Sequence, residues 1–151
     1  MNNLGLQNQI LADSPRIVEA IQTGAAWEVW MQVELVLILR AAGLQAAREV
    51  PYPPPNGQLL LDVIAQDNAG GYAIELKVES AHNAGPFVMI GVNADRQKLM
   101  LYPQPAPGAR WAVGICYSNV AVQSMVQFAN NQANNAIFNY QNNIGVLVAT
   151  V

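Results

Sequence analysis

The chain has 151 residues, of which 52% are hydrophobic and only 11% are charged, so it can bury a core and is not disordered. Its net charge of −3 argues against a protein that coats nucleic acid through a broad basic face. It does not exclude an enzyme with a bound cation, because the cation itself supplies local positive charge. We expect one domain over residues 1–151, with residues 1–24 as an N-terminal helical extension.

The N-terminal segment MNNLGLQNQ has neither the basic region nor the long apolar run of a signal peptide. The longest apolar run, at residues 29–39, is interrupted by Gln32 and Glu34 and is shorter than the about 20 residues that a membrane span needs. We therefore expect a cytoplasmic protein that does not bind membranes, and leave export without a cleaved signal open. With one cysteine, Cys116, and one histidine, His82, the sequence does not favour a zinc site.

The predicted elements alternate between helices and strands. The Asp13-Ser14-Pro15 segment can start a helix that ends near Gly24, and residues 25–42 form a second helix that is apolar nearly all round. The later elements are strands at 47–52, 58–65, 72–79 and 110–118, a strand followed by a helix within 87–101, an amphipathic helix at 119–142 and a strand at 145–151. This order predicts an α/β sandwich.

Two of these strands carry charged residues where the pattern calls for packing residues. Asp62 lies in LLLDVIA, Glu75 and Lys77 lie in YAIELKVES, and the DNAGG segment between them is typical of a turn. Because side chains alternate along a strand, Glu75 and Lys77 share a face. If Gln66 pairs with Gly71, Asp62 lies opposite Glu75, whereas a slip of one residue would turn Asp62 to the other face.

Two neighbouring carboxylates repel each other, and a divalent cation between them removes that repulsion. Carboxylate oxygens suit Mg²⁺ or Mn²⁺, and a water on such a cation can attack a phosphodiester. We therefore predict that Asp62 and Glu75 hold the metal. Lys77 would orient or deprotonate the water, or stabilise the transition state. The alternative is an ordinary solvated strand face.

The segment from about Trp27 to Glu79 resembles the helix and three-strand core of the PD-(D/E)XK nuclease superfamily. The ELK tripeptide at 75–77 matches the second half of that signature, whereas Leu61 stands where the first half has proline. The resemblance implies a restriction-endonuclease-like three-layer α/β core, with a central mixed sheet of about four to five strands flanked by helices. It also implies a Mg²⁺- or Mn²⁺-dependent nuclease, with DNA as the expected substrate and RNA as the alternative. A bacterial toxin, effector or defence nuclease would suit a chain this short.

The superfamily usually adds an acidic residue from the helix before the first core strand. Glu34 fits by order and by its apolar surroundings, so we expect it among the catalytic and metal-binding residues. Glu28, with Gln32 one turn further on, is the competing choice, and an ion pair with Arg40 is the structural alternative for Glu34. The further candidates for substrate contact are Glu49, His82, Arg96 and Lys98. An ion pair for Glu49, a surface loop for His82 and a solvated helix face for the other two are the corresponding structural interpretations.

Two other functions compete with a nuclease. The first is a catalytically inactive subunit with the nuclease fold that acts in protein binding or oligomeric assembly, and a large exposed apolar patch would support it. The second is a structural α/β protein in a homo-oligomer, and Asp62 facing away from Glu75 would support that one. Under the nuclease interpretation the expected partner is nucleic acid, chiefly DNA. The two competing functions leave a homodimer or a protein partner open.

Overall fold

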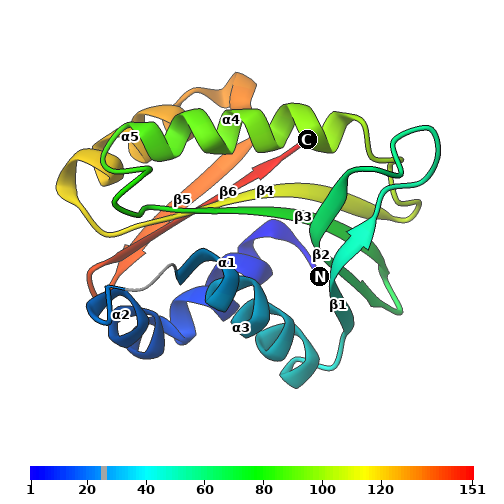
Figure 1. Cartoon of the computed structure of the whole chain (residues 1–151), viewed down its shortest axis with the longest axis horizontal. Coiled ribbons are helices and arrows are strands. Elements are labelled where there is room, and N and C mark those ends of the chain that lie inside the picture. Colours follow the sequence, from blue (N-terminus) through cyan, green and yellow to red (C-terminus); the bar gives the residue numbers. More distant parts are fainter. Residues whose placement is uncertain (25–26) are drawn as a thin grey trace.

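The computed structural model describes residues 1–24 and 27–151. In that part of the chain, five α-helices, one 3₁₀ helix and six β-strands form three layers (Figure 1). The helices are α1 (Asn3–Ala12), α2 (Ser14–Gln22), α3 (Trp27–Ala41), α4 (Phe87–Met100), α5 (Asn119–Asn130) and the 3₁₀ helix η1 (Gln132–Asn134). The strands are β1 (Gln45–Pro51), β2 (Leu60–Asp67), β3 (Gly70–Val78), β4 (Gly108–Cys116), β5 (Ala136–Gln141) and β6 (Ile144–Thr150). The predicted α/β class is confirmed.

All the strands belong to one mixed sheet with the order β1-β2-β3-β4-β6-β5. Strands β3 and β4 are parallel, and every other neighbouring pair is antiparallel. Helix α4 makes the connection between β3 and β4, since parallel neighbours need a crossover. The sheet is mixed, as predicted, but its described part has six strands rather than four to five.

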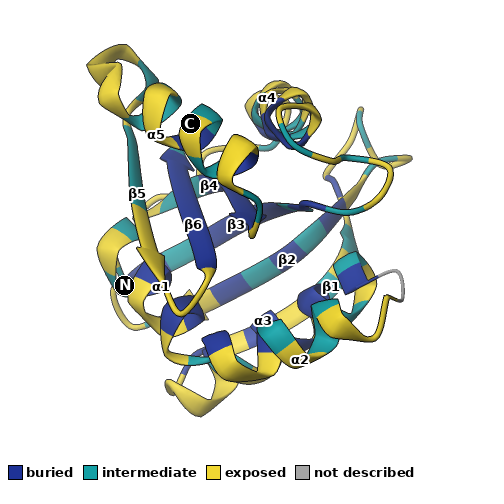
Figure 2. Ribbon diagram, turned by 90° about the vertical axis from the view of Figure 1, so that its left-hand side faces the viewer, coloured by how far each residue is buried: buried dark blue, intermediate teal, exposed yellow. Residues whose placement is uncertain are grey.

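Helices cover both faces of the sheet. Helices α1, α2 and α3 lie on one face and α4 and α5 on the other (Figure 1). Side chains of strand β4 alternate between the two faces. Trp111 and Val113 pack in the core on the side of α1 and α3. Ala112 and Cys116 pack in the core on the side of α4 and α5. The inner faces of the layers are accordingly buried and the outer helix surfaces exposed (Figure 2).

The N-terminal segment predicted as a helical extension contributes to the first core. Leu6 and Ile10 of α1 are fully buried among these residues, and the side-chain amide of Gln7 donates to the carbonyl of Val146, 2.9 Å away. Helix α1 therefore packs directly on β6. None of the helices at 1–24 and 27–151 has the length and apolarity that crossing a bilayer requires.

Residues 87–101 do not begin as a strand, so that prediction is wrong. Helix α4 starts at Phe87 and buries Val88, Val92 and Leu99 against the sheet, while Phe87 and Ile90 remain 60% and 65% exposed. The apolar run FVMIGV contains both the buried and the exposed face of this helix. A continuous apolar run of that length does not distinguish a strand from a helix.

The predicted helix at 119–142 is also too long. Helix α5 ends at Asn130, and residues 136–141 form β5, which pairs with β6. The connecting turn contains Asn142 and Asn143, both with positive φ angles, 51° and 65°. Two such residues in succession are typical of a tight hairpin turn, and asparagine tolerates this conformation better than most residues. This hairpin supplies the strand that the sequence analysis missed.

The predicted start of the second helix at residues 25–26 lies outside the described residues. From Trp27 onward the prediction is confirmed, and so are the strands at 110–118 and 145–151, within two residues of their ends.

Candidate active site between strands β2 and β3

The β2–β3 hairpin has the register that brings the two predicted metal ligands together. Gln66 pairs with Gly71, as the sequence analysis required, and the pairing continues to Val63 and Ile74. In this register the next positions along the two strands are Asp62 and Glu75. The two carboxylates therefore lie across from one another rather than on opposite faces.

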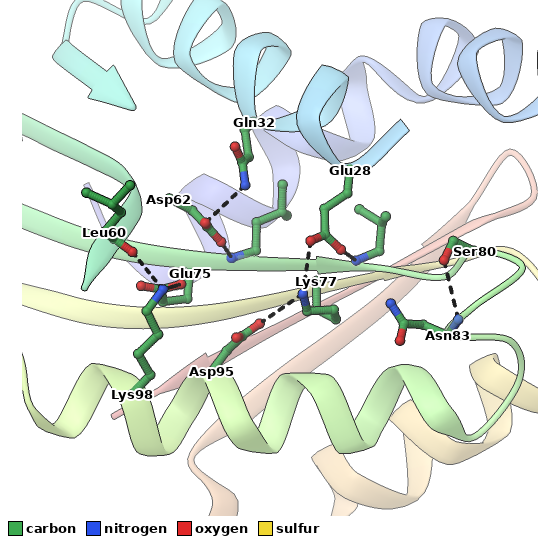
Figure 3. A network of polar contacts seen from close by, with 12 residues as sticks. Glu28, Gln32, Leu60, Asp62, Glu75, Lys77, Ser80, Asn83, Asp95 and Lys98 are labelled. Carbon is green, nitrogen blue, oxygen red and sulfur yellow. Dashed lines mark hydrogen bonds and ion pairs between the residues drawn. The ribbon is translucent and has the colours of Figure 1, made fainter. Parts of the chain in front are cut away.

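The two strands separate at this position. Beyond Val63 and Ile74 no further residues of β2 and β3 pair, and Leu61 of β2 pairs only with β1. The edge of β3 is satisfied by side chains instead, because Oδ2 of Asp62 accepts a hydrogen bond from the Leu76 N–H, 2.8 Å away. The gap that results contains polar side chains from α3 on one side and α4 on the other (Figure 3).

Glu75 is the most buried member of this cluster, with 1% of its surface exposed. Its Oε1 accepts from the Tyr52 hydroxyl and its Oε2 from the Lys98 ammonium, each at 2.8 Å. Burial, and then the negative charge of Asp62, raise the pKa of Glu75 to about 8 despite the opposing effect of Lys98 and Tyr52. A cation at this carboxylate would have to displace a proton that Glu75 still holds near neutral pH.

Lys77 joins the two helices that border the site. Its Nζ lies 2.9 Å from Oε1 of Glu28 on α3 and 4.0 Å from Oδ2 of Asp95 on α4. Burial acts to lower the pKa of Lys77, but the negative charges of Asp95 and Glu28 outweigh it and raise that pKa. Lys77 is therefore protonated at neutral pH.

Asp95 is the clearest residue that sequence reasoning missed. It lies on α4 beside Lys77, and burial raises its pKa to about 7 while the charge of Lys77 opposes that effect. Its Oδ2 is buried and accepts no hydrogen bond from the described residues. Asp95 and Lys98 both lie in the second half of residues 87–101, which was predicted to be helical, so their one-turn spacing on a single helix face was an available signal that went unused.

Tyr52 and Gln32 also belong to the site. Gln32 donates its side-chain amide to Oδ1 of Asp62, 3.0 Å away, and accepts from the Arg48 guanidinium at 3.1 Å. Gln32 thus contacts Asp62 from the side of α3 (Figure 3), and Arg48 holds the Gln32 amide. The position of Gln32 four residues after Glu28 was the available sequence signal, since residues at that spacing share a helix face.

Glu34 does not reach this cluster. Its Oε2 lies 3.0 Å from the guanidinium of Arg16 on α2, and burial raises its pKa although Arg16 opposes that effect. Two residues along a helix turn a side chain by about 200°, so Glu34 and Gln32 cannot both face Asp62. The structure brings Glu28 to the site, which favours the competing choice for the helical acid.

The four candidates for substrate contact have different surroundings. Lys98 is part of the site through Glu75, and its Nζ also donates to the Leu60 carbonyl, 2.7 Å away. Glu49 forms an ion pair of 2.6 Å with Arg48, which itself reaches Gln32. The other two are not brought to the site, because His82 lies exposed in the loop after β3 and Arg96 lies over the ring of Phe128 on α5.

The donor set fits a hard divalent cation in chemistry but not yet in arrangement. Buried Glu75 and half-buried Asp62 and Asp95 supply carboxylate oxygens of the kind that Mg²⁺ and Mn²⁺ prefer. Across residues 1–24 and 27–151, however, no three or more His, Cys, Asp or Glu side chains are grouped so as to hold a metal ion. The ammonium of Lys98 contacts the Glu75 oxygen that a cation would use, so cation binding requires Lys98 to move. The residues present therefore fit a divalent cation in their donor chemistry, and Asp62, Glu75 and Asp95 would have to come closer together to hold one.

The chain matches no protein-family model, no curated protein and no solved structure.

Proposed function

We propose that this chain is a metal-dependent nuclease of the PD-(D/E)XK type that hydrolyses phosphodiester bonds in DNA. The observation that carries the proposal is the meeting of Asp62, Glu75 and Lys77 where β2 and β3 separate. A solvated strand face would leave such groups exposed, whereas here Asp62 and Glu75 have pKa values raised by burial. Buried acids with perturbed pKa values are more typical of functional sites than of surfaces.

Asp62 and Glu75 would hold Mg²⁺ or Mn²⁺. Asp95, whose Oδ2 lies 4.0 Å from the Lys77 ammonium, is the candidate for a third ligand. The bound cation would acidify a water and neutralise charge on the phosphate. Lys77, being protonated, would stabilise the negative charge that develops on the phosphate oxygens in the transition state. Glu28 and Asp95 hold the ammonium from two sides and so fix the position of that charge.

Lys98 would then have two partners during the reaction. In the structure its ammonium lies 2.8 Å from Oε2 of Glu75. If that carboxylate held a cation, the Lys98 ammonium would be free to contact a phosphate of the substrate.

A second candidate function is a catalytically inactive subunit with this fold that binds a protein partner. The observation that favours it is an apolar stripe on α3, where Val29, Val33 and Leu37 are 53%, 40% and 48% exposed. These residues are spaced four apart and so lie on one helix face. In this alternative the Lys98–Glu75 ion pair is permanent and no cation binds.

Cleavage of plasmid and of single-stranded DNA in Mg²⁺ or Mn²⁺ tests the proposal. We expect cutting that EDTA abolishes and that Lys77→Ala reduces by about 10²- to 10³-fold. Glu19→Gln is the matched control, because Glu19 is exposed on α2 and lies outside the site. Folded wild-type protein that cuts neither substrate with either metal would refute the nuclease and favour the binding subunit.

A further inference from the structure

A separate cavity of about 240 Å³ lies beside the candidate active site. It occupies the same side of the sheet as α4, next to the β2–β3 hairpin. Its floor includes Ile64 and Ala73, and its walls include Pro53, Tyr102 and Gln104. None of its lining residues is charged, so it suits a neutral group.

The wall formed by Tyr102 is held in place before any ligand binds. The Tyr102 N–H donates to the Leu99 carbonyl, and the Tyr102 carbonyl accepts from the Arg110 guanidinium, each at 3.0 Å. Its ring packs edge-on against Tyr52, with the ring centres 4.9 Å apart. Binding at such a wall requires little ordering of the side chain.

The cavity lies next to the catalytic cluster along the same two strands. Ile64 is two residues from Asp62, and Ala73 is two residues from Glu75, so each pair is separated by about 7 Å along its strand. The contact through Tyr52 gives a second link, since the Tyr52 hydroxyl donates to Glu75. A group in the cavity therefore lies close to a phosphate placed at Asp62 and Glu75.

We infer that this cavity binds one nucleobase of the substrate, stacked on the ring of Tyr102, next to the phosphodiester that is cleaved. The lining is mostly apolar with two amides, Gln66 and Gln104, which matches a flat ring with polar edges. The Gln104 amide nitrogen donates to the Gly108 carbonyl, 3.2 Å away, and this orients its oxygen as an acceptor.

A base can enter this cavity only when it is not stacked in a duplex. The substrate class is therefore nucleic acid with an unpaired nucleotide at the cut, either single-stranded or with a base turned out of the helix. The low basic content of the chain agrees with this, because stacking on an aromatic ring supplies affinity without positive charge. The inference rests on the proposed nuclease function and names its substrate.

The first arm of the test locates the ligand by NMR of the full chain in EDTA, where no metal-dependent cleavage occurs. Thymidine 5′-monophosphate should shift the methyl signals of Ile64 and Ala73, because the stacked base places a ring current beside them. Deoxyribose 5-phosphate, which lacks the base, should leave those signals unmoved. Equal shifts with both probes, or tighter binding of N-acetylphenylalaninamide, would overturn the inference, and the latter would indicate a peptide site.

The second arm measures binding of a fluorescein-labelled oligothymidylate at fixed salt in EDTA. Tyr102→Ala should weaken binding by about 5- to 150-fold, as expected for loss of one stacked base, while Tyr102→Phe retains the ring and should bind as the wild type does. Tyr140→Ala is the matched control, because Tyr140 is 44% exposed on β5 and outside the cavity. Thermal unfolding of each variant separates loss of the site from loss of the fold.

The two proposals fail separately. If Tyr102→Ala binds as tightly as the wild type while the wild type still cleaves, the cavity inference is refuted and the nuclease remains. If the base binds as expected but no metal supports cleavage, the nuclease is refuted and the cavity remains a nucleotide-binding site.

Discussion

The ammonium of Lys98 lies 2.8 Å from Oε2 of Glu75, at the carboxylate that the proposed cation would bind. Glu75 is almost fully buried, whereas the Lys98 side chain is 29% exposed. The lysine can therefore leave toward solvent while the acid stays in place. This relationship makes Lys98 a competitor of the cation in the resting site.

The competition predicts the effect of Lys98→Ala on metal binding. Removal of the ammonium leaves Glu75 beside Asp62 with less positive charge, so a divalent cation should bind at least about tenfold more tightly. Isothermal titration with Mn²⁺ at constant pH measures this. Binding that is unchanged or weaker in the variant would contradict the competition.

The raised pKa values predict how stability depends on pH when no cation is present. Glu75 and Asp95 keep their protons in the folded protein up to about pH 8 and about pH 7, whereas in the unfolded chain they lose them near 4.5 and 3.8. Between these limits the unfolded state binds fewer protons, so the free energy of unfolding falls as pH rises. The fall from pH 5 to pH 8 should be on the order of a few kcal/mol.

Urea unfolding in EDTA at several pH values checks this dependence. Glu75→Gln should flatten the slope, since the amide has no proton to lose, and saturating Mg²⁺ should flatten it in the wild type. A free energy of unfolding that rises from pH 5 to pH 8 in EDTA would show that these acids are not held protonated.

A substitution at Gly91 should displace Lys77 without changing its charge. A Cβ at Gly91 on α4 would lie 2.7 Å from Cγ of Lys77, so Gly91→Ala must push the lysine stem away from the helix. A shift of about 1 Å in a catalytic group can cost about 10²-fold in rate, whereas the cost in stability should stay within about 1–3 kcal/mol. Cleavage rate and thermal unfolding are measured together.

Gly57→Ala is the matched control for this variant. The nearest atom to a Cβ there is the Tyr52 carbonyl oxygen at 3.6 Å, which is ordinary contact. Gly91→Ala with wild-type activity would mean that the exact position of Lys77 does not matter for the reaction.

Comparing Glu28→Gln with Glu34→Gln shows which acidic residue of α3 takes part in the reaction. Loss of the Glu28 charge frees Lys77 from one of its two partners and should reduce cleavage by about 10- to 100-fold, as for residues that orient a catalytic group. Glu34→Gln should retain cleavage, because Glu34 contacts Arg16 and not the site. The opposite result in the same assay would restore Glu34 as the functional acid.

The hairpin and its three charged residues could be predicted from the sequence because they depend on local rules. Strand alternation puts Glu75 and Lys77 on one face, and the turn at residues 67–70 fixes which residue of β2 lies opposite Glu75. The register was confirmed at Gln66 and Gly71.

The remaining members of the site come from elements that only tertiary packing brings to the hairpin. Asp95 and Lys98 depend on the position of α4 over β3, and Tyr52 depends on how the chain leaves β1. Glu34 was preferred to Glu28 for its apolar surroundings, but the rotation of α3 about its own axis decides which acid faces the sheet. That rotation is set by packing of Met31 and Leu35 in the core, which periodicity alone does not determine in a helix that is apolar nearly all round.

The rate of DNA cleavage as a function of Mn²⁺ concentration, compared between the wild type and Asp62→Asn, tests the central claim most directly. If Asp62 and Glu75 hold the catalytic cation, the wild-type rate rises with Mn²⁺ and saturates, and Asp62→Asn needs far more Mn²⁺ or shows no rate at all. If both proteins are folded and give the same curve, or neither cuts at any concentration, the carboxylates between β2 and β3 are not a metal-dependent nuclease centre.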